Sequence, residues 1–331
     1  MSLRQLVSPS RYRRCRAIFR RPLAAQIALA AGWSWGREWR LKSGDRIRVP
    51  RVRSMRPLFD WLLESAPDPL PVAAEAGCFI FRHGPSHVCL RPAAEDFEVF
   101  QEVFLRDTYR VGQLRPSLGT VLDLGAHVGL FALRVAALAE RVICVEPAAA
   151  NAAVLEQTVR RNALGDKVRL HRGAITAGTT PRVSLFLAGR DYGHSLQASY
   201  AARWGAPTHE EVPAWGLAEL FEREQIDRCG LLKCDIEGAE YAVFEAAPRD
   251  LLERIDRLIL EVHLLRPRWE EPRLARLMAK LRDAGLTVAF GSPRRPAKGE
   301  DAPDAARDSL EPLYEQLSRD RPWALLFAQR T

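Results

Sequence analysis

The chain has 331 residues, enough at roughly 150 residues per domain for one large catalytic unit and an accessory segment. Hydrophobic residues make up 47% and charged residues 27% of it, which excludes disordered, collagen-like and disulfide-dense proteins. The net charge of +8 is unevenly distributed, because residues 1–56 alone carry 15 Lys and Arg against 2 acidic residues. The six cysteines lie at scattered spacings without a CxxC pair, so we expect reduced thiols and no zinc site.

Residues 1–56 are an Arg-rich amphipathic segment in which basic residues precede an apolar patch from Leu23 to Trp35. On one interpretation the segment packs its apolar side on the main domain. On the other it contacts anionic membrane lipid or an acidic partner, because clustered Arg with interleaved Trp and Leu suits an interface. Nucleic acid is not predicted as a partner, since no base-reading motif accompanies the charge.

The longest apolar run near the start, Pro22 to Trp33, contains Gln26 and is shorter than the roughly 20 residues of a membrane-spanning helix. It also lacks the order of a signal peptide, in which a basic region, an apolar core and a small-residue cleavage site follow one another. We therefore expect a cytoplasmic protein, with peripheral membrane association as the open alternative.

Turn residues and short apolar runs organise the chain before residue 118. The sequence SAPDPLP from Ser65 to Pro71 predicts a linker. Two strands are predicted at Cys78–Arg82 and Ser86–Leu90, and apolar residues at helical spacing predict a helix over 95–110. We therefore divide the chain into a basic N-terminal extension (1–70), lead-in strands and helix (71–117) and a main domain (118–331).

From Thr120 onward, apolar strand-like runs alternate with helical stretches, a pattern typical of a parallel sheet covered on both faces. The predicted strands are Val121–Leu124, Val142–Glu146, Val168–His171, Leu231–Asp235, Leu258–His263, Thr287–Phe290 and Trp323–Ala328, with a hairpin-like region around Val183–Leu187. The predicted helices are Gly129–Ala139, Ala148–Asn162, Leu217–Glu224, Ala239–Ala246 and Arg273–Ala284. We therefore expect a doubly wound α/β fold of mostly parallel strands, with residues 291–321 as a charged insertion.

A loop with the pattern Asp123-x-Gly125-x-x-x-Gly129 follows the first strand of this domain. Glycines let the backbone turn sharply and approach a ligand, and the carboxylate would repel a pyrophosphate but suits an amino-acid ammonium group. Glu146 ends the second strand, where a carboxylate accepts hydrogen bonds from ribose hydroxyls. These features favour an adenosine ligand with a cationic amino-acid tail. Alternatively, the glycines serve helix packing and Glu146 caps the next helix.

Titratable residues gather where the fourth and fifth strands end. The fourth delivers Asp235, Glu237 and Glu240, and the fifth delivers Glu261 and His263. If the strands are parallel, these groups share one edge with the glycine loop. For Lys233, Glu240 and Glu261 a structural role, as ion pairs among themselves, is the favoured interpretation.

Five segments in chain order resemble the FkbM family of S-adenosylmethionine-dependent O-methyltransferases: DLGAHVGLF, VEP, RNAL, LLKCDIEGAEYAVFE and LILEVH. The resemblance runs from about Phe97 to His263, and its most specific mark is D-x-E-G-x-E from Asp235 to Glu240. It implies a seven-strand, Rossmann-like class I methyltransferase fold and methyl transfer to a hydroxyl of a sugar, glycan or secondary metabolite. His127 replaces the family's usual Asn and Ala149 a frequent Pro, but a His still donates from one ring nitrogen.

The residues and the resemblance together define a predicted site. The predicted cofactor is S-adenosylmethionine, and its predicted binding residues are Asp123, Gly125, Ala126, His127, Gly129, Glu146 and Ala174. The predicted catalytic residues are Asp235, Glu237 and His263: Asp235 or His263 takes the hydroxyl proton, and Glu237 orients the acceptor. No metal site is predicted. The loop Gly193–Leu196 resembles the family's small-residue loop and is expected to wall the acceptor pocket.

Two other functions stay open. A nucleic-acid methyltransferase would fit the basic N-terminus, but the fourth strand ends in CDIEG rather than in the N/D-P-P-Y-type element that clamps a flipped base. A protein that binds the cofactor without catalysing transfer would have less reason to keep the acidic strand ends and His263 together. The expected substrate is therefore a hydroxyl-bearing small molecule or glycan.

Overall fold

The structure, a computed structural model, describes residues 9–31, 38–48, 57–65, 72–92, 95–178, 180–189, 193–263, 267–291 and 323–330. Contacts divide the chain into two compact units, Met1–Phe100 with Arg160–Asn162 and Gln101–Val159 with Ala163–Thr331. The division into 1–70, 71–117 and 118–331 stays a prediction. The predicted linker and the predicted insertion lie outside the described residues except for their first residues. None of the described helices combines the length and the apolar run needed to cross a membrane.

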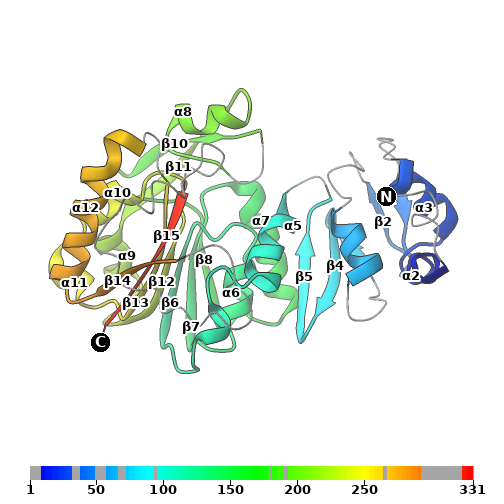
Figure 1. The fold of residues 1–331 in the computed structure, drawn as a ribbon, viewed down its shortest axis with the longest axis horizontal. Helices are drawn as coiled ribbons and strands as arrows, with labels where there is room; N and C mark the ends of the chain where they lie inside the picture. Colours follow the sequence, from blue (N-terminus) through cyan, green and yellow to red (C-terminus); the bar gives the residue numbers. More distant parts are fainter. Residues whose placement is uncertain are drawn as a thin grey trace. The chain divides into compact units, whose positions relative to one another are not determined.

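The described residues of the first unit form short helices and two small antiparallel sheets (Figure 1). They comprise α2 (Pro9–Ile18), α3 (Pro22–Ala31), β1 (Glu38–Arg40), β2 (Arg46–Arg48), the π-helical turn η1 (Trp61–Ser65), β3 (Ala73–Glu75), β4 (Cys78–His83), β5 (Ser86–Leu90) and α5 (Asp96–Phe100). The predicted pair of strands is confirmed as the antiparallel hairpin of β4 and β5.

Aromatic side chains build the core of the first unit. The rings of Phe59 and Phe79 meet edge to face with centroids 5.4 Å apart, and Phe81 meets Phe100 in the same way at 5.5 Å. Arg11, only 3% exposed, pairs with acidic side chains of the segment 57–65. The Arg-rich segment therefore contributes one arginine to the interior, where its charge is neutralised.

The predicted helix over 95–110 is shorter than expected. After α5, a π-helical turn η2 (Gln101–Leu105) ends the helical run, and a short 3₁₀ turn η3 (Val111–Gln113) follows. Asp107 and Arg110 have φ values of 53° and 55°, in the left-handed region that a right-handed helix cannot include. Apolar spacing alone did not reveal this break.

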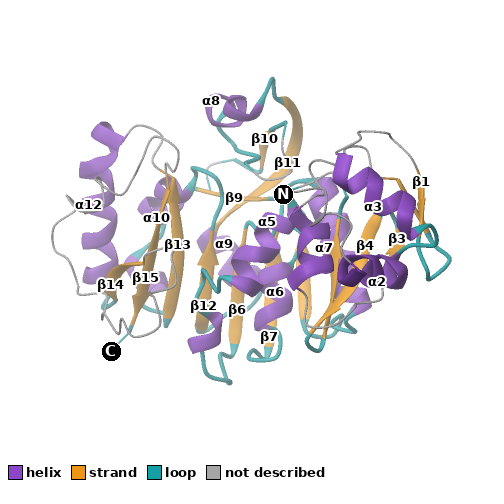
Figure 2. Cartoon of the chain, turned by 45° about the vertical axis from the view of Figure 1, so that its right-hand side comes forward, coloured by secondary structure: helices purple, strands orange, loops and turns teal. Residues whose placement is uncertain are grey.

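A seven-strand sheet is the centre of the second unit (Figures 1 and 2). Its order is β14-β15-β13-β12-β6-β7-β8, formed by β6 (Thr120–Leu124), β7 (Arg141–Val145), β8 (Val168–His171), β12 (Cys229–Cys234), β13 (Arg257–His263), β14 (Thr287–Gly291) and β15 (Trp323–Gln329). The five strands β8, β7, β6, β12 and β13 run parallel to one another. Strand β15 lies between β13 and β14 and is antiparallel to both. The predicted doubly wound, mostly parallel sheet is confirmed.

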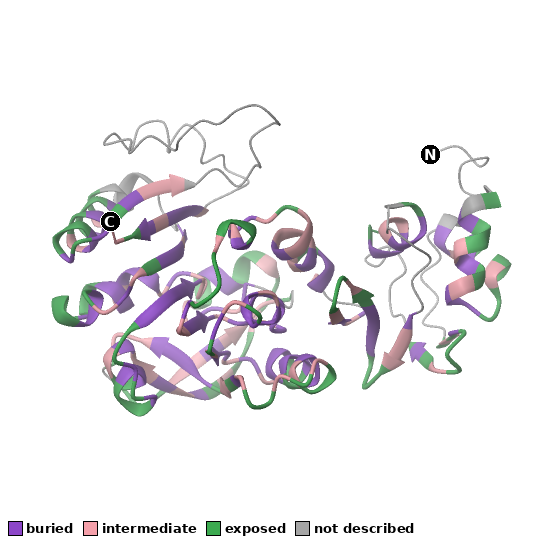
Figure 3. Cartoon of the chain, turned by 90° about the horizontal axis from the view of Figure 1, so that it is seen from below, coloured by how far each residue is buried: buried purple, intermediate pink, exposed green. Residues whose placement is uncertain are grey.

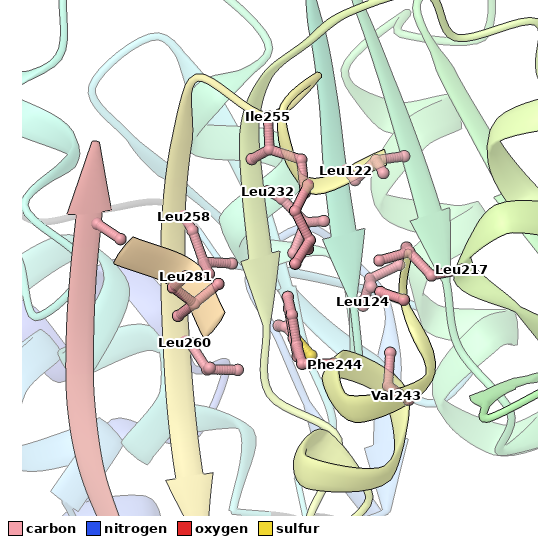
Figure 4. Close-up of a cluster of buried hydrophobic side chains, with 14 of the residues drawn as sticks. Leu122, Leu124, Leu217, Leu232, Val243, Phe244, Ile255, Leu258, Leu260 and Leu281 are labelled. Atoms are coloured by element: carbon pink, nitrogen blue, oxygen red, sulfur yellow. The ribbon is translucent and has the colours of Figure 1, made fainter. Parts of the chain in front are cut away.

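Helices flank this sheet, and its strands are largely buried (Figure 3). The helices are α6 (Leu130–Val135), α7 (Ala149–Arg161), α9 (Leu217–Arg223), α10 (Glu240–Ala246), α11 (Arg249–Leu252) and α12 (Pro267–Asp283). Residues of α9 to α12 share one core with Leu122, Leu124 and Leu232 (Figure 4). Because strand side chains alternate between faces, Asp123 and Lys233 point to the opposite face of the sheet.

A smaller sheet of β9 (Ala174–Thr176), β10 (Arg182–Leu187) and β11 (Thr208–Gly216) follows β8, with α8 (Ala198–Ala201) and the 3₁₀ turn η4 (Ala202–Trp204) between β10 and β11. The hairpin-like region is confirmed as β10, which pairs antiparallel with β11. Strand β11 was not predicted. Its first half is His209, Glu210 and Glu211, so that the apolar alternation begins only at Val212.

Candidate active site

The glycine loop makes a tight turn between β6 and α6. Gly125, His127 and Gly129 all have positive φ, at 74°, 51° and 80°. A Cβ atom on Gly125 would lie 1.7 Å from the backbone oxygen of Asp235, and one on Gly129 would lie 2.8 Å from the side chain of Leu155. The glycines therefore serve packing as well as turning, and Gly125 brings the loop into contact with the end of β12.

Glu146 connects the glycine loop to α7. Its Oε2 accepts a hydrogen bond from the backbone N–H of His127 at 2.8 Å. Its Oε1 accepts from the backbone N–H of Ala148 at 3.0 Å and from Nδ2 of Asn151 at 3.2 Å. Burial raises the pKa of Glu146, and these hydrogen bonds oppose the rise. Glu146 therefore caps the start of α7, as the alternative interpretation expected. Its Oε2 accepts one hydrogen bond from the protein and has the capacity to accept another.

Lys233 is a buried cation beneath this loop. Its Nζ donates to the backbone oxygen of Gly125 at 2.8 Å and lies 3.4 Å from Asp123 Oδ1 and 3.6 Å from Asp235 Oδ2. Burial alone would lower the pKa of Lys233, but Asp235 and Asp123 outweigh it, so the pKa is raised and the amine stays charged. The ion-pair partners of Lys233 within 4 Å are therefore these aspartates; Glu261 also raises its pKa, whereas Glu240 pairs with His263 instead.

His263, at the end of β13, is surrounded by carboxylates. Its Nδ1 lies 2.8 Å from Glu240 Oε1, and its Nε2 lies 3.2 Å from Glu237 Oε2 and 3.6 Å from Glu261 Oε1. Burial lowers the pKa of His263, but the carboxylates of Glu237 and Glu240 raise it by more than burial lowers it. The pKa of His263 therefore lies well above its ordinary value. Both ring nitrogens face carboxylates, an arrangement that favours the protonated form of the ring.

Asp235 has a partly exposed side chain, and one of its two carboxylate oxygens accepts a hydrogen bond from the protein. Its side chain is 21% exposed, and its Oδ2 accepts a hydrogen bond from the hydroxyl of Tyr109 at 3.4 Å. Its buried Oδ1 has no hydrogen-bond partner among the described residues. Asp123 also has carboxylate oxygens without a hydrogen-bond partner among the described residues, but its side chain is fully buried, whereas that of Asp235 is partly exposed.

Two tyrosines complete the site, and neither was predicted from the sequence. Tyr109 contacts Asp235, and Tyr200 packs edge to face on His263 with centroids 5.6 Å apart while hydrogen-bonding Glu237. Both lie outside the central strands, where no periodic pattern marks them. The loop Gly193–Leu196 contacts the site as well, because Ser195 Oγ donates a hydrogen bond to the backbone oxygen of Glu237 at 2.6 Å.

The predicted catalytic residues lie together, and the predicted cofactor residues lie along the adjoining strand ends. Ligand atoms of Asp235, Glu237 and His263 all lie within 4.8 Å of one another, so this group of described residues can hold a divalent ion. Lys233 and His263 already lie beside the carboxylates of Asp235 and Glu237. That the site holds no resident metal ion remains a prediction. Ala174 is not part of this group of three residues; it is buried with Ala148 in a small apolar cluster of the β10–β11 sheet.

The stability of the fold is expected to depend on the charge of His263. Because its folded pKa is raised, its stabilising contribution is fully present below about pH 6.5, the ordinary value, and is lost as pH rises through the folded pKa. Urea unfolding of wild type and His263→Gln should therefore differ most at acidic pH. A difference that grows toward alkaline pH would contradict a charged His263.

Residues 123–287 match the family model described as the methyltransferase FkbM domain. No curated protein matches the sequence. Among solved structures, methyltransferase FkbM from Methylobacillus flagellatus KT is similar at 15% identity with a TM-score of 0.40, over 66% of this chain and only 46% of that one.

Two further solved structures are similar at lower identity. Precorrin-6y C5,15-methyltransferase from Geobacter metallireducens GS-15 shares 10% identity over 68% of this chain and 86% of that one, with a TM-score of 0.35. TYW2 from M. jannaschii, in complex with AdoMet, shares 10% identity over 78% of this chain and 89% of that one, with a TM-score of 0.39.

The sheet order, the glycine loop after β6 and the acidic ends of β12 and β13 define a class I methyltransferase fold. Residues 123–287 belong to the methyltransferase FkbM domain family.

Proposed function

We propose that this protein uses S-adenosylmethionine to methylate a hydroxyl group of a sugar, glycan or secondary metabolite. The observation that carries the proposal is the carboxylate of Asp235. Its buried Oδ1 has no hydrogen-bond partner among the described residues, and its backbone oxygen abuts Gly125 of the glycine loop. A proton acceptor thus stands beside the loop that we assign to the cofactor.

The residues around the loop fit the proposed cofactor. Oε2 of Glu146 accepts one hydrogen bond from the protein and can accept another from a ribose hydroxyl. Two carboxylates, those of Asp123 and Asp235, lie within 4 Å of the single positive charge of Lys233, and this excess of acidic groups favours a cationic ligand. S-adenosylmethionine, when bound, supplies a methyl group on a positively charged sulfur. Asp123, Gly125, Ala126, His127, Gly129, Glu146 and Ala174 remain the proposed binding residues.

Asp235, rather than His263, is the proposed base. Both nitrogens of His263 face carboxylates, and the raised pKa keeps the ring protonated at neutral pH. It therefore has no lone pair for a hydroxyl proton. The carboxylate of Asp235 would take the hydroxyl proton as the methyl group passes from sulfur to the acceptor oxygen and the carbon–sulfur bond breaks, so no free alkoxide has to form.

A hydroxylated acceptor suits the other side chains of the site. Glu237 and Glu261 are carboxylates that can accept hydrogen bonds from additional hydroxyls, and Glu237 is held by His263 and Tyr200. The loop with Ser195 and Gln197 is fastened to the backbone of Glu237 and Gly238, so it can wall the acceptor pocket. Because polyols present several donors at once, this set favours a sugar over an isolated alcohol.

The test is transfer of label from methyl-labelled S-adenosylmethionine into fractionated host lysate by wild type and Asp235→Asn. Label is expected in a glycan, glycolipid or small-metabolite fraction with wild type, and the variant should transfer far less. Label in nucleic acid would support the competing nucleic-acid methyltransferase. Cofactor binding without label in any fraction would support a binding role.

A further inference from the structure

The first unit exposes apolar side chains on one helix pair. Tyr12 on α2 is 38% exposed, and Leu23 and Ile27 on α3 are 53% and 45% exposed; these are the exposed large hydrophobic residues of the described chain. On α3, Leu23, Ala24 and Ile27 share the solvent-facing side, while Ala25 and Leu29 are buried. An isolated exposed leucine is ordinary, but a helix that is apolar on its outer face marks a contact surface.

Positive charge surrounds this apolar face. From Pro9 to Ala31 the sequence has six Arg and no acidic residue. Arg13 and Arg16 lie on the exposed side of α2 together with Tyr12, and the exposed Arg20 and Arg21 lie just before α3. Arg11 pairs with acidic side chains of the segment 57–65, so the surface of the two helices combines aliphatic side chains, an aromatic residue and the exposed cations Arg13, Arg16, Arg20 and Arg21.

We propose that the α2–α3 surface docks on the headgroup region of an anionic lipid bilayer. Leu23 and Ile27 enter the boundary between headgroups and acyl chains, and the exposed arginines contact lipid phosphates and carboxylates. Each helix has 10 residues, which is too short to span a bilayer, so the pair would lie in the headgroup region at the membrane surface. A nucleic acid would neutralise the arginines equally well. Its phosphate backbone, however, has no apolar surface that could contact the aliphatic face of α3.

The test is co-sedimentation of the full chain with vesicles of phosphatidylcholine alone or with added phosphatidylserine. Wild type should bind the anionic vesicles and lose binding as salt rises above about 0.1 M. Leu23→Ser with Ile27→Ser should bind about tenfold more weakly, whereas Leu23→Val with Ile27→Val should bind nearly as wild type.

A second pair of variants isolates the charge. Arg16→Gln with Arg20→Gln should weaken binding by about fivefold per charge removed, and Arg16→Lys with Arg20→Lys should keep it. Circular dichroism and methyl transfer by each variant report on folding, since these residues lie outside the proposed active site.

Three results would overturn the proposal: failure of folded wild type to bind anionic vesicles, equal binding to neutral vesicles, or no effect of the serine substitutions. RNA binding that depends on Arg16 and Arg20 but not on Leu23 and Ile27 would assign the surface to nucleic acid instead. The methyl-transfer experiment is independent of all these outcomes.

Discussion

Asp235→Asn is expected to lower kcat by about 10²- to 10⁴-fold, the usual contribution of a positioned general base. The substitution keeps the size of the side chain, so the contacts to Tyr109 and the backbone contact with Gly125 should survive. Binding of S-adenosylmethionine, measured by calorimetry, should weaken only modestly, because the carboxylate of Asp123 remains beside Lys233. The same method with Glu146→Ala should show a large loss of affinity, because that change removes the proposed ribose acceptor and three existing hydrogen bonds.

Asp256→Asn is the matched control for this prediction. Asp256 is also partly exposed and charge-paired, with Arg228, but it lies at the opposite end of β13 from His263. Its substitution should leave kcat within about twofold of wild type. An Asp235→Asn variant as active as the control, or one that loses cofactor binding as fully as Glu146→Ala, would contradict the roles given to these residues.

Gly125→Ala is expected to remove more than about 3 kcal/mol from the free energy of unfolding. The new methyl group would lie 1.7 Å from the backbone oxygen of Asp235, and the residue already has φ of 74°. Either the loop or the end of β12 must move, so cofactor binding and methyl transfer should fail together. Urea unfolding followed by circular dichroism measures the first effect, and calorimetry the second.

Gly119→Ala separates the clash from the backbone strain. Gly119 precedes β6 with φ of 62°, and a Cβ atom there would have no neighbour within 4 Å. It should therefore cost only the left-handed conformation, about 1–2 kcal/mol. Equal destabilisation by the two substitutions would mean that the contact between the glycine loop and Asp235 is not essential.

Much of the site could be predicted because parallel strands bring their carboxyl ends to one edge. The apolar runs located β6, β7, β12 and β13, and the polar residues just beyond them had to converge. Asp235, Glu237 and His263 do so within 4.8 Å. The resemblance to a family added the identity of the cofactor, which spacing alone left as an adenosine with a cationic tail.

Other features depend on neighbours that a single sequence does not specify. Lys233 stands directly opposite Asp123 across β12 and β6, a pairing that follows only once the strand order is known. Tyr109 and Tyr200 reach the site from outside the central sheet, where packing decides their direction. The same holds for His263, because the carboxylates that raise its pKa come from β13, from α10 and from the loop between β12 and α10.

The antiparallel insertion of β15 constrains when the protein can acquire its site during synthesis. His263 pairs with Trp323 across β13 and β15, so 323 − 263 = 60 further residues must leave the ribosome before β13 gains this neighbour. At roughly 5–20 residues per second this takes about 3–12 s. During that interval the strand carrying His263 is an open edge of the nascent chain, available to chaperones or to unwanted pairing. Strand β15 thus closes the edge of β13 next to the proposed active site.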